Sequence, residues 1–384
     1  MKKILLVLVL VCAALLAGFA LWHFYLQPAG LKKTAQPKAS PTPAPTPTEA
    51  DKIQEMIAAM PLEKKIGQLF LARVPQVNQV EDVRDYHLGG YLMFARDFQG
   101  ETTETVAAKI AGYQSASEIP LLIGVDEEGG EVTRLWYGQG ILAPPFASPS
   151  QLYAQGGLDL VRQDTANKAE ILKACGINYN LAPVADVAQD PESFIYDRTV
   201  GLDAAGTSEY VTTVVSEMKK DGVASCLKHF PGYGDNKDSH GEMVWDTRPM
   251  QSFEETDLLP FKAGIAAGAD SVLVAHNIVA AFDPDYPASL SEKVHAYLRK
   301  ELGFEGVAVT DDFEMAGLRN FADVNTAALL TLKAGSDLII SSYYKDQIPF
   351  LMDAGATGQL PEDVVDEHLR RVLQMKVNLG LIIL

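Results

Sequence analysis

The sequence predicts an α/β fold, a (β/α)8 TIM barrel that forms one globular domain behind an N-terminal apolar segment and a linker. Eight short apolar runs recur from residue 60 onward, and longer segments with helical spacing lie between them. Near-continuous apolar strands joined through helices are typical of buried parallel strands, and eight such units indicate a barrel. An open, doubly wound sheet is the alternative, but its Gly-rich phosphate fingerprint is absent after the first strand.

The first fifty residues are predicted to lie outside this barrel. Residues 4–25 contain no Lys, Arg, Asp or Glu and follow two lysines, so 1–28 reads as a signal sequence or a membrane anchor. The length of the run favours an anchor, and small residues within it also suit cleavage. Residues 29–50 are rich in Pro, Thr and Ala, which predicts a disordered linker. We expect an extracytoplasmic protein, either anchored through this helix or secreted.

The remaining residues, 51–384, are predicted to form the barrel domain. About 330 residues are enough for one large domain with its own core. The formal net charge of −18 argues against a nucleic-acid partner and against adhesion to anionic lipids. The chain has 3 cysteines, too few for a disulfide scaffold, so the fold must rest on its core. We expect a monomer that meets the membrane only through its N-terminal segment.

The predicted strands and helices alternate along the barrel domain. Each strand is a short apolar run bounded by Gly, Pro or Asp. The predicted strands are 66–74, 89–96, 120–128, 177–187, 223–230, 270–276, 306–312 and 336–342. The helices expected between them include 104–116, 158–175, 207–220, 290–302 and 361–379.

Polar residues stand at the C-terminal ends of five consecutive predicted strands. In barrels these ends form the face where the functional site lies. One such residue alone is as readily explained as a structural cap, but polar residues after five strands together predict a concave, acidic and partly histidine-lined site. They are Asp126, Asp186, Lys228 with His229, His276, and Asp311 with Asp312.

Metal and phosphate chemistry are both disfavoured at this predicted site. Metal-dependent barrel hydrolases place a His-x-His pair on the first strand, and 66–74 contains no histidine. A phosphate site near strands seven and eight would need backbone donors, whereas this chain has "TDDFEM" at 310–315. We therefore expect no metal and no cofactor.

A carboxylate nucleophile with a separate proton donor is the arrangement that glycoside hydrolysis needs. Asp311 follows the apolar "GVAVT" and is therefore held at a rigid strand end, as a nucleophile should be. In the loop "KHFPGYGDNKDSH", Asp238 and His240 are two residues apart, so the Asp can orient the ring and raise its basicity. On residues alone, a surface turn explains this Asp-x-His pair equally well.

Eight blocks of the barrel domain resemble a known family in the same order along the chain. The resemblance is to the single-barrel β-N-acetylglucosaminidase (β-hexosaminidase) branch of glycoside hydrolase family 3. The blocks are "EKKIGQLF" (63–70), "DEEGGEVTRL" (126–135), "LAPVADV" (181–187), "YDRTVG" (196–201), "KHFPGYGDNKDSH" (228–240), "SVLVAH" (271–276), "VTDDFEMAGL" (309–318) and "AGSDLII" (334–340).

This resemblance implies the catalytic roles. Asp311 matches the family nucleophile, and Asp312 is its neighbour. His240 matches the acid/base residue, with Asp238 as its orienting partner. The dyad distinguishes this branch from the β-glucosidases of the family, which take their acid/base residue from a second domain.

The resemblance also implies a binding site for a terminal N-acetylglucosamine. The matching residues are Asp126, Arg134, Arg198, Lys228 and His229, with His276 and Met315 beside them. His276 and Asp186 have pocket shaping as an equal alternative, and Met315 has a plain core role. The family's common "PGHG" reads "PGYG" at 231–234, and the stretch before the dyad is one residue shorter. We expect the glycines of this neck to act as a hinge for the loop.

The implied activity is that of a retaining exo-β-N-acetylglucosaminidase, a glycoside hydrolase. Its expected partner is a carbohydrate, either an N-acetylglucosamine-containing glycan or a muropeptide from peptidoglycan. Two other functions stay open: a β-glucosidase of the same family, and a wall-tethered glycan-binding barrel without catalysis. Loss of the nucleophile or the dyad would mark the latter, and both are present in the sequence.

Overall fold

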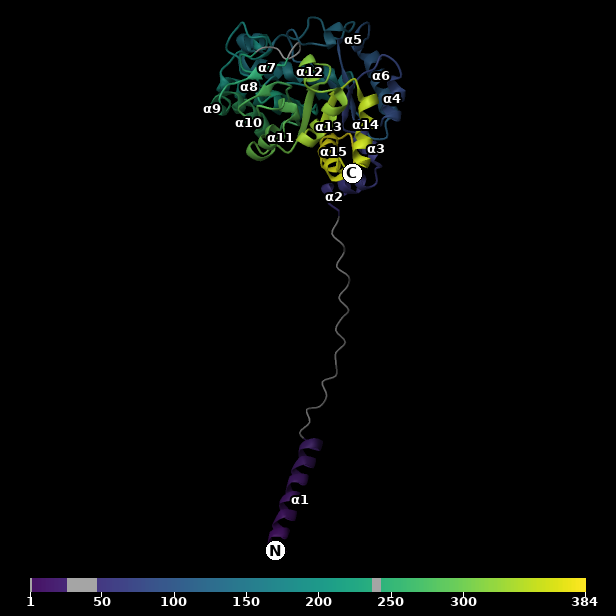
Figure 1. Cartoon of the computed structure of the whole chain (residues 1–384), viewed down its shortest axis with the longest axis vertical. Helices are drawn as coiled ribbons and strands as arrows, with labels where there is room; N and C mark the ends of the chain where they lie inside the picture. The colour runs from purple at the N-terminus through teal and green to yellow at the C-terminus, as the bar shows by residue number, and fades with distance from the viewer. Residues whose placement is uncertain (1, 26–46, 237–242) are drawn as a thin grey trace. The chain divides into compact units, whose positions relative to one another are not determined.

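The computed structural model describes residues 2–25, 47–236 and 243–384, and the chain divides into two compact units, 1–46 and 47–384 (Figure 1). The first unit contains helix α1 (Lys2–Tyr25). Among the described residues, no helix combines the length and apolar character that a membrane span requires. The anchor or signal sequence at 1–28 and the linker at 29–50 stay predictions from the sequence.

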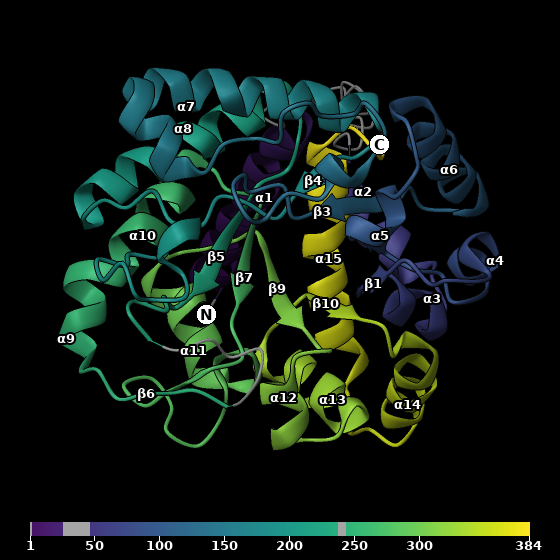
Figure 2. The ribbon, with the colours of Figure 1, turned by 90° about the horizontal axis from the view of Figure 1, so that it is seen from above.

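The second unit is built around a sheet of eight parallel strands (Figure 2). Along the sheet the order is β4-β3-β2-β1-β10-β9-β7-β5. Strands that follow one another in the barrel sequence are therefore neighbours, and the first strand, β1, pairs with the last, β10. The strands are β1 (Phe70–Arg73), β2 (Gly90–Met93), β3 (Leu122–Val125), β4 (Tyr179–Asn180), β5 (Cys226–Phe230), β7 (Ser271–Val274), β9 (Val307–Asp312) and β10 (Leu338–Ser341).

The sheet closes between β4 and β5. Isolated parallel bridges join Tyr179 to Ala224 and Val184 to Lys228, and the amide of Asn180 donates to the carbonyl of Ala224 at 2.9 Å. Closure removes the two exposed edges that an open sheet would leave. The predicted TIM barrel is confirmed, and the open sheet is excluded.

The strands are shorter than the predicted runs because each run also contains the adjoining loop or helix. Helix α3 (Leu62–Gly67), for example, enters the first run, 66–74, before β1 begins. All four residues of β2, β3, β7 and β10 are buried. Strands buried on both faces have no polar positions to alternate with, which is why the sequence reads as continuous apolar runs.

Helices surround the barrel, and several begin at a side chain that caps the first turn. Ser148 accepts a hydrogen bond from the amide of Gln151, and Asp203 does the same for Gly206. The helices that follow the strands are α4 (Gln79–Asp85), α5 (Ala95–Phe98), α6 (Thr103–Ala116), α7 (Pro149–Ala174), α8 (Ala204–Asp221), α9 (Met250–Ser252), α10 (Leu258–Ala267), α11 (Glu292–Ala296), α12 (Ala316–Phe321), α13 (Val324–Ala334), α14 (Tyr344–Ala356) and α15 (Glu362–Asn378).

Two predicted helices differ from the observed ones. A helical segment that was not predicted precedes the helix predicted at 158–175: it begins at Pro149, where Ser148 caps it, and non-helical backbone angles at Gly156 and Gly157 form a kink between the two segments. The helix predicted at 290–302 is α11 continued by a π-helical turn over Tyr297–Glu301. The other three match α6, α8 and α15 to within three residues at each end.

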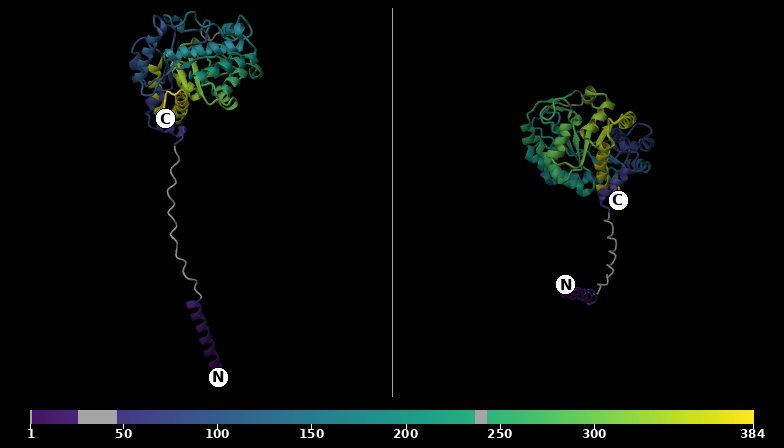
Figure 3. Two further views of the ribbon diagram at one scale, coloured as in Figure 1. Left: turned by 180° about the vertical axis from the view of Figure 1, so that it is seen from behind. Right: turned by 60° about the horizontal axis from the view of Figure 1, so that its bottom comes forward.

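The beginning and the end of the second unit lie together. Helix α2 (Glu49–Ala58) packs against α15, and Nε2 of Gln374 donates to Oε1 of Glu49 at 2.5 Å. Both helices lie beside the C-terminus in two views of the molecule (Figures 1 and 3). A short two-stranded sheet, β6 (Trp245–Asp246) with β8 (Ile278–Val279), joins the loops that follow β5 and β7.

Candidate active site

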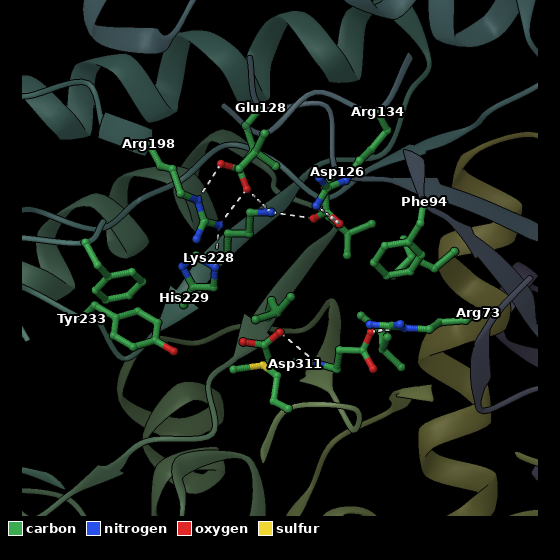
Figure 4. Close-up of a pocket in the computed structure, with 18 residues that line it drawn as sticks. Arg73, Phe94, Asp126, Glu128, Arg134, Arg198, Lys228, His229, Tyr233 and Asp311 are labelled. Carbon is green, nitrogen blue, oxygen red and sulfur yellow. Dashed lines mark hydrogen bonds and ion pairs between the residues drawn. The ribbon is translucent and has the colours of Figure 1, made fainter. Parts of the chain in front are cut away.

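A cavity of about 140 Å³ opens at the C-terminal ends of the strands (Figure 4). Pockets for drug-sized ligands are usually several times larger, so this cavity suits one small unit, such as a single sugar ring. Residues from all the barrel strands or the loops after them line it: Arg73, Leu92, Phe94, Asp126, Glu128, Val132, Arg134, Leu181, Phe194, Arg198, Lys228, His229, Tyr233, Leu273, Asp311, Asp312, Met315 and Ile340.

The ammonium group of Lys228 lies between two carboxylates. Its Nζ is 2.7 Å from Oδ1 of Asp126 and 2.6 Å from Oε1 of Glu128, and the side chain is 2% exposed. Burial alone would lower the pKa of Lys228, but the two carboxylates outweigh burial and raise it. Lys228 therefore stays charged in the cavity wall and can donate to a ligand oxygen.

Glu128 also binds Arg198 through both carboxylate oxygens. Nη2 of Arg198 lies 2.8 Å from Oε1, and Nε lies 3.0 Å from Oε2. Burial would raise the pKa of Glu128, but Arg198 and Lys228 hold it well below its ordinary value. A two-pronged pair of this kind fixes the guanidinium plane, so Glu128 sets the direction in which Arg198 faces the cavity.

His229 is held between Arg198 and a buried carboxylate. Nη2 of Arg198 donates to Nε2 of His229 at 3.1 Å, and because arginine can only donate, the ring proton resides on Nδ1. That Nδ1 donates to Oδ2 of Asp186 at 2.7 Å. Asp186 also accepts the backbone amides of His229 and Tyr233. The predicted strand-four aspartate thus orients the histidine that lines the cavity.

Both Lys228 and His229 line the cavity although neighbouring strand residues normally face opposite sides. The ladder between β5 and β7 shifts register between Leu227 and Phe230. Such an irregularity turns one side chain away from strict alternation, so both residues reach the cavity.

The loop after β3 is organised by another buried acid, Glu127. Its carboxylate accepts the hydroxyl of Thr133 and the amides of Arg134 and Leu135, the latter two at 2.8 and 3.0 Å. Burial raises the pKa of Glu127 despite these hydrogen bonds. The loop directs Arg134 into the cavity wall, where its guanidinium carbon is 5.9 Å from the centre of the Phe94 ring.

Asp311 and Asp312 are the last two residues of β9, and their carboxylates have different hydrogen-bond partners. Oδ1 of Asp311 accepts the backbone amide of Asp312 at 2.8 Å. The carboxylate of Asp312 instead takes Nε of Arg73 at 2.5 Å and the amide of Glu314 at 3.0 Å. Burial raises the pKa of Asp312 to about 6, with Arg73 opposing the rise. Figure 4 shows Asp311 across the cavity from Lys228.

The comparison with protein families identifies the barrel. Residues 61–375 match the family described as "Glycosyl hydrolase family 3 N terminal domain". The chain belongs to glycosyl hydrolase family 3. The prediction that it is a glycoside hydrolase of the β-hexosaminidase type is confirmed.

Relatives named β-hexosaminidase share about a third of the aligned residues with this chain. A protein named β-hexosaminidase from Xylella fastidiosa (strain M12) is 32% identical over 266 residues, which span 68% of this chain and 78% of that protein. A protein of the same name from Xanthomonas campestris pv. campestris (strain B100) is 34% identical over 257 residues, covering 66% and 76%.

Solved structures of similar proteins superpose on the barrel. A β-N-acetylglucosaminidase from Paenibacillus sp. str. FPU-7 has a TM-score of 0.79 at 32% identity, over 84% of this chain; this chain spans 63% of that longer protein. A β-N-acetylhexosaminidase from Beutenbergia cavernae DSM 12333 has a TM-score of 0.73 at 26% identity, covering 83% of this chain and 99% of that one.

The family 3 barrel brings most of the predicted site residues together. Asp311 and six of the predicted binding residues line the one cavity, namely Asp126, Arg134, Arg198, Lys228, His229 and Met315. The assigned roles of all of them stay predictions. Asp238 and His240 lie outside the described residues.

His276 is not among the described residues that line the cavity. It is fully buried, its Nδ1 lies 2.7 Å from Oγ of Ser289, and its ring meets the edge of Phe313. These contacts fit the shaping role that the sequence left open, and a contact with sugar stays a prediction.

Several residues of the family 3 site were missed by sequence reasoning. Glu128 is the third acid of "DEE" at 126–128, and acids that run on into a Gly-Gly turn after a predicted strand are a usable signal. Arg73 stands at the C-terminal end of the first strand, which the same strand-end argument could have included. Phe94 carried no such signal.

Across the described ranges, no group of three or more His, Cys, Asp or Glu side chains is arranged to hold a metal.

Proposed function

We propose that this family 3 enzyme is a retaining exo-β-N-acetylglucosaminidase that removes terminal β-linked N-acetylglucosamine from peptidoglycan fragments. The observation that carries the proposal is that Asp311 lines the same small cavity as the charged pair Lys228 and Asp126. A strand-end carboxylate opposite fixed donors and acceptors is what an enzyme needs to hold a sugar ring over its nucleophile.

The proposed reaction has two steps. In the first, a carboxylate oxygen of Asp311 bonds to the anomeric carbon while the bond to the departing oxygen breaks, and His240 gives that oxygen a proton. In the second, His240 takes a proton from water, the water oxygen bonds to the anomeric carbon, and the bond to Asp311 breaks. Asp238 orients His240. A histidine suits this role beside an anionic nucleophile because its deprotonated form adds no negative charge.

The cavity wall supports recognition of sugar hydroxyl and acetamido groups. Asp126 and Glu128 supply acceptors, and Lys228 and Arg198 supply donors whose positions these acids hold. Nε of Arg134 is buried and has no hydrogen-bond partner among the described residues. A buried donor without a partner is costly, so a ligand oxygen is a fitting acceptor for it.

The deciding experiment replaces Asp311 with Asn in the soluble domain. We expect hydrolysis of an aryl β-N-acetylglucosaminide to fall by more than about 1,000-fold, because an amide cannot form the glycosyl intermediate. Asp346→Asn, at an exposed position on α14, is the matched control. Proton NMR of the first-formed sugar should show the β anomer. Unchanged hydrolysis by Asp311→Asn, or an α product, would refute the mechanism.

The substrate is tested by comparing turnover of muropeptides, chitobiose and an aryl β-glucoside. We expect both N-acetylglucosamine substrates to be cleaved, and muropeptides with the higher kcat/KM. Preferred cleavage of the glucoside would instead make the enzyme a β-glucosidase, and binding without turnover would make it a glycan-binding protein.

We further propose that the barrel acts outside the cytoplasm. Support comes from the uncharged apolar run at 4–25 and the Pro/Thr-rich stretch at 34–50. Cell fractionation of the full chain, beside a chain lacking 1–28, tests this. Equal amounts of both chains in the cytoplasmic fraction would contradict it.

A further inference from the structure

Arg248 joins the chain segments on the two sides of residues 237–242. It lies just after β6, and its Nη2 donates to the carbonyl of Gly232 at 3.1 Å, on the far side of that stretch. Its guanidinium also binds Asp246, at 2.7 Å from Nη2, and Asp257, at 2.9 Å from Nη1. One side chain thus contacts both flanks of the loop and the helical turn before α10.

A second contact ties the same two flanks. Nδ2 of Asn236 donates to Oδ2 of Asp246 at 2.7 Å and to the carbonyl of Tyr233 at 2.8 Å. The side chain of Asp246 is fully buried, and its backbone carbonyl accepts the amide of Ala280 at 2.9 Å. The flanks are therefore bound to each other and, through β6 and β8, to the loop after β7.

The two glycines of the neck leave room for these contacts. Gly232 has φ 121° and Gly234 has φ 54°, in the region that favours glycine. A Cβ on Gly232 would lie 2.6 Å from Asp257, and one on Gly234 would lie 2.4 Å from Nη1 of Arg248. Close packing against Arg248 and Asp257 is thus one reason why these positions are glycines, and their role as a hinge stays a prediction.

We propose that Arg248 is a positioning residue for proton transfer. Gly232, Asn236, Asp246, Arg248 and Asp257 form what we call the Arg248 frame, and this frame fixes where the chain leaves the barrel toward His240 and where it returns. The inference rests on the proposed function, in which His240 is the acid/base residue. Because a proton donor must stand within hydrogen-bond distance of the departing oxygen, a displaced frame would weaken proton transfer.

Arg248 would act through the loop and without touching the sugar. It is not among the described residues that line the Asp311 cavity; it lines a separate cavity of about 640 Å³ beside Asn236 and Asp203. Substrate binding and nucleophilic attack by Asp311 therefore do not depend on it directly. Its loss should affect the proton-transfer component of the reaction.

This component can be measured by changing the leaving group. A dinitrophenolate departs as a stable anion and needs little protonation, whereas an unsubstituted phenolate needs a proton as the bond breaks. The kcat/KM value reports the first step, in which that bond breaks. For Arg248→Met we expect kcat/KM on the phenyl β-N-acetylglucosaminide to fall about 100-fold, and on the dinitrophenyl substrate to fall far less.

Three further variants make the result specific. Arg248→Lys keeps the charge and should recover part of the loss on the phenyl substrate. Asn236→Ala removes the hydrogen bond to Asp246 and leaves Arg248 in place. Its kcat/KM should also fall more on the phenyl than on the dinitrophenyl substrate, so it tests the proposal even if Arg248→Met does not fold. Arg162→Met, a half-exposed surface position on α7, controls for loss of an arginine as such.

His240→Ala is measured in parallel so that the two proposals can fail separately. Suppose that His240→Ala loses much more activity on the phenyl substrate than on the dinitrophenyl substrate. If Arg248→Met then loses activity equally on both substrates, or on neither, the proposed role of Arg248 is wrong. If His240→Ala shows no split, the acid/base assignment is wrong and the role of Arg248 falls with it.

Discussion

Arg198 binds both carboxylate oxygens of Glu128, at 2.8 and 3.0 Å, within the wall of the Asp311 cavity. The two residues are 70 positions apart in the chain, and Lys228 meets the same carboxylate from a third strand end. A buried acid between two cations holds both of them ionised and fixes their directions.

Glu128→Gln should weaken substrate binding. The amide nitrogen is a donor, so Arg198 or Lys228 would face a donor in place of an acceptor. A hydrogen bond to a buried charged group contributes about 1.5–3 kcal/mol, which corresponds to a rise of roughly 10- to 100-fold in KM. Steady-state kinetics on the aryl substrate measure this. Glu131→Gln, exposed in the same loop, should behave as wild type; equal kinetics for both variants would contradict the role of Glu128.

Asp186→Asn should change the protonation pattern of His229. The carboxylate now accepts Nδ1–H and two backbone amides, and an amide group cannot accept all three. We expect the ring proton to move toward Nε2, where it opposes the Arg198 donor. Nitrogen-15 NMR of labelled histidine reports the tautomer directly. An unaltered His229 signal would show that Asp186 does not set it, and Asp190→Asn, on the exposed loop nearby, is the control.

Lys376→Met should stabilise the protein near neutral pH. Lys376 is fully buried, and its Nζ donates to Oε1 of Gln68 at 2.7 Å; burial lowers its pKa from 10.5 to about 7. The folded state therefore prefers the neutral amine. The stability that this group contributes is present above pH 10.5 and is lost as pH falls toward 7, by an amount on the order of 4 kcal/mol.

The advantage of Lys376→Met over wild type should thus be largest at pH 7 and shrink as pH rises to 10. Urea unfolding at four pH values between these limits measures it. The exposed Lys333→Met on α13 should show no such trend. A constant difference between Lys376→Met and wild type at every pH would disprove the buried-lysine account.

Asp337→Asn should destabilise the barrel without changing substrate binding or catalysis. Asp337 is fully buried before β10, where it accepts Arg299, Arg371, Nδ1 of His368 and the amide of Ala308. Burial would raise its pKa, but the cations hold it below its ordinary value, so its contribution to stability is present at neutral pH and is lost in acid.

Breaking such a buried pair from one side costs about 3–5 kcal/mol. We expect a clear fall in Tm for Asp337→Asn, with KM unchanged at temperatures where the variant is folded, because Asp337 lies at the opposite end of β10 from the cavity. Asp363→Asn, exposed in the first turn of α15, is the control. A raised KM with an unchanged Tm would contradict this placement.

The barrel and the position of Asp311 were predictable because both depend on local pattern. Strands buried on both faces must be apolar throughout, and the residue that follows such a run emerges at the C-terminal face. Asp126, Lys228 and Asp311 were found in this way, each from its own strand. The resemblance to family 3 then assigned roles that pattern alone left open.

The partners of these residues were not predictable because they come from distant parts of the chain. Arg73 and Asp312 form an ion pair 239 residues apart, and nothing beside either residue indicates the other. The glycines of the neck illustrate the same limit. Their conformational freedom suggested a hinge, which stays a prediction, but the packing of Arg248 and Asp257 against them could not be foreseen from the sequence.

The sequence by itself determined the fold class, the family and the strand ends at which the charged residues lie. The apolar pattern of the strands and the order of the motifs lie in consecutive residues, so both can be recognised without a structure. Only the tertiary structure decided which charges meet: Glu128 with Arg198, Asp186 with His229, and Arg248 with the base of the loop. The Asp186–His229 pair depends on the closure of the barrel between β4 and β5, and the other two depend on how the loops after the strands fold, which no run of consecutive residues records.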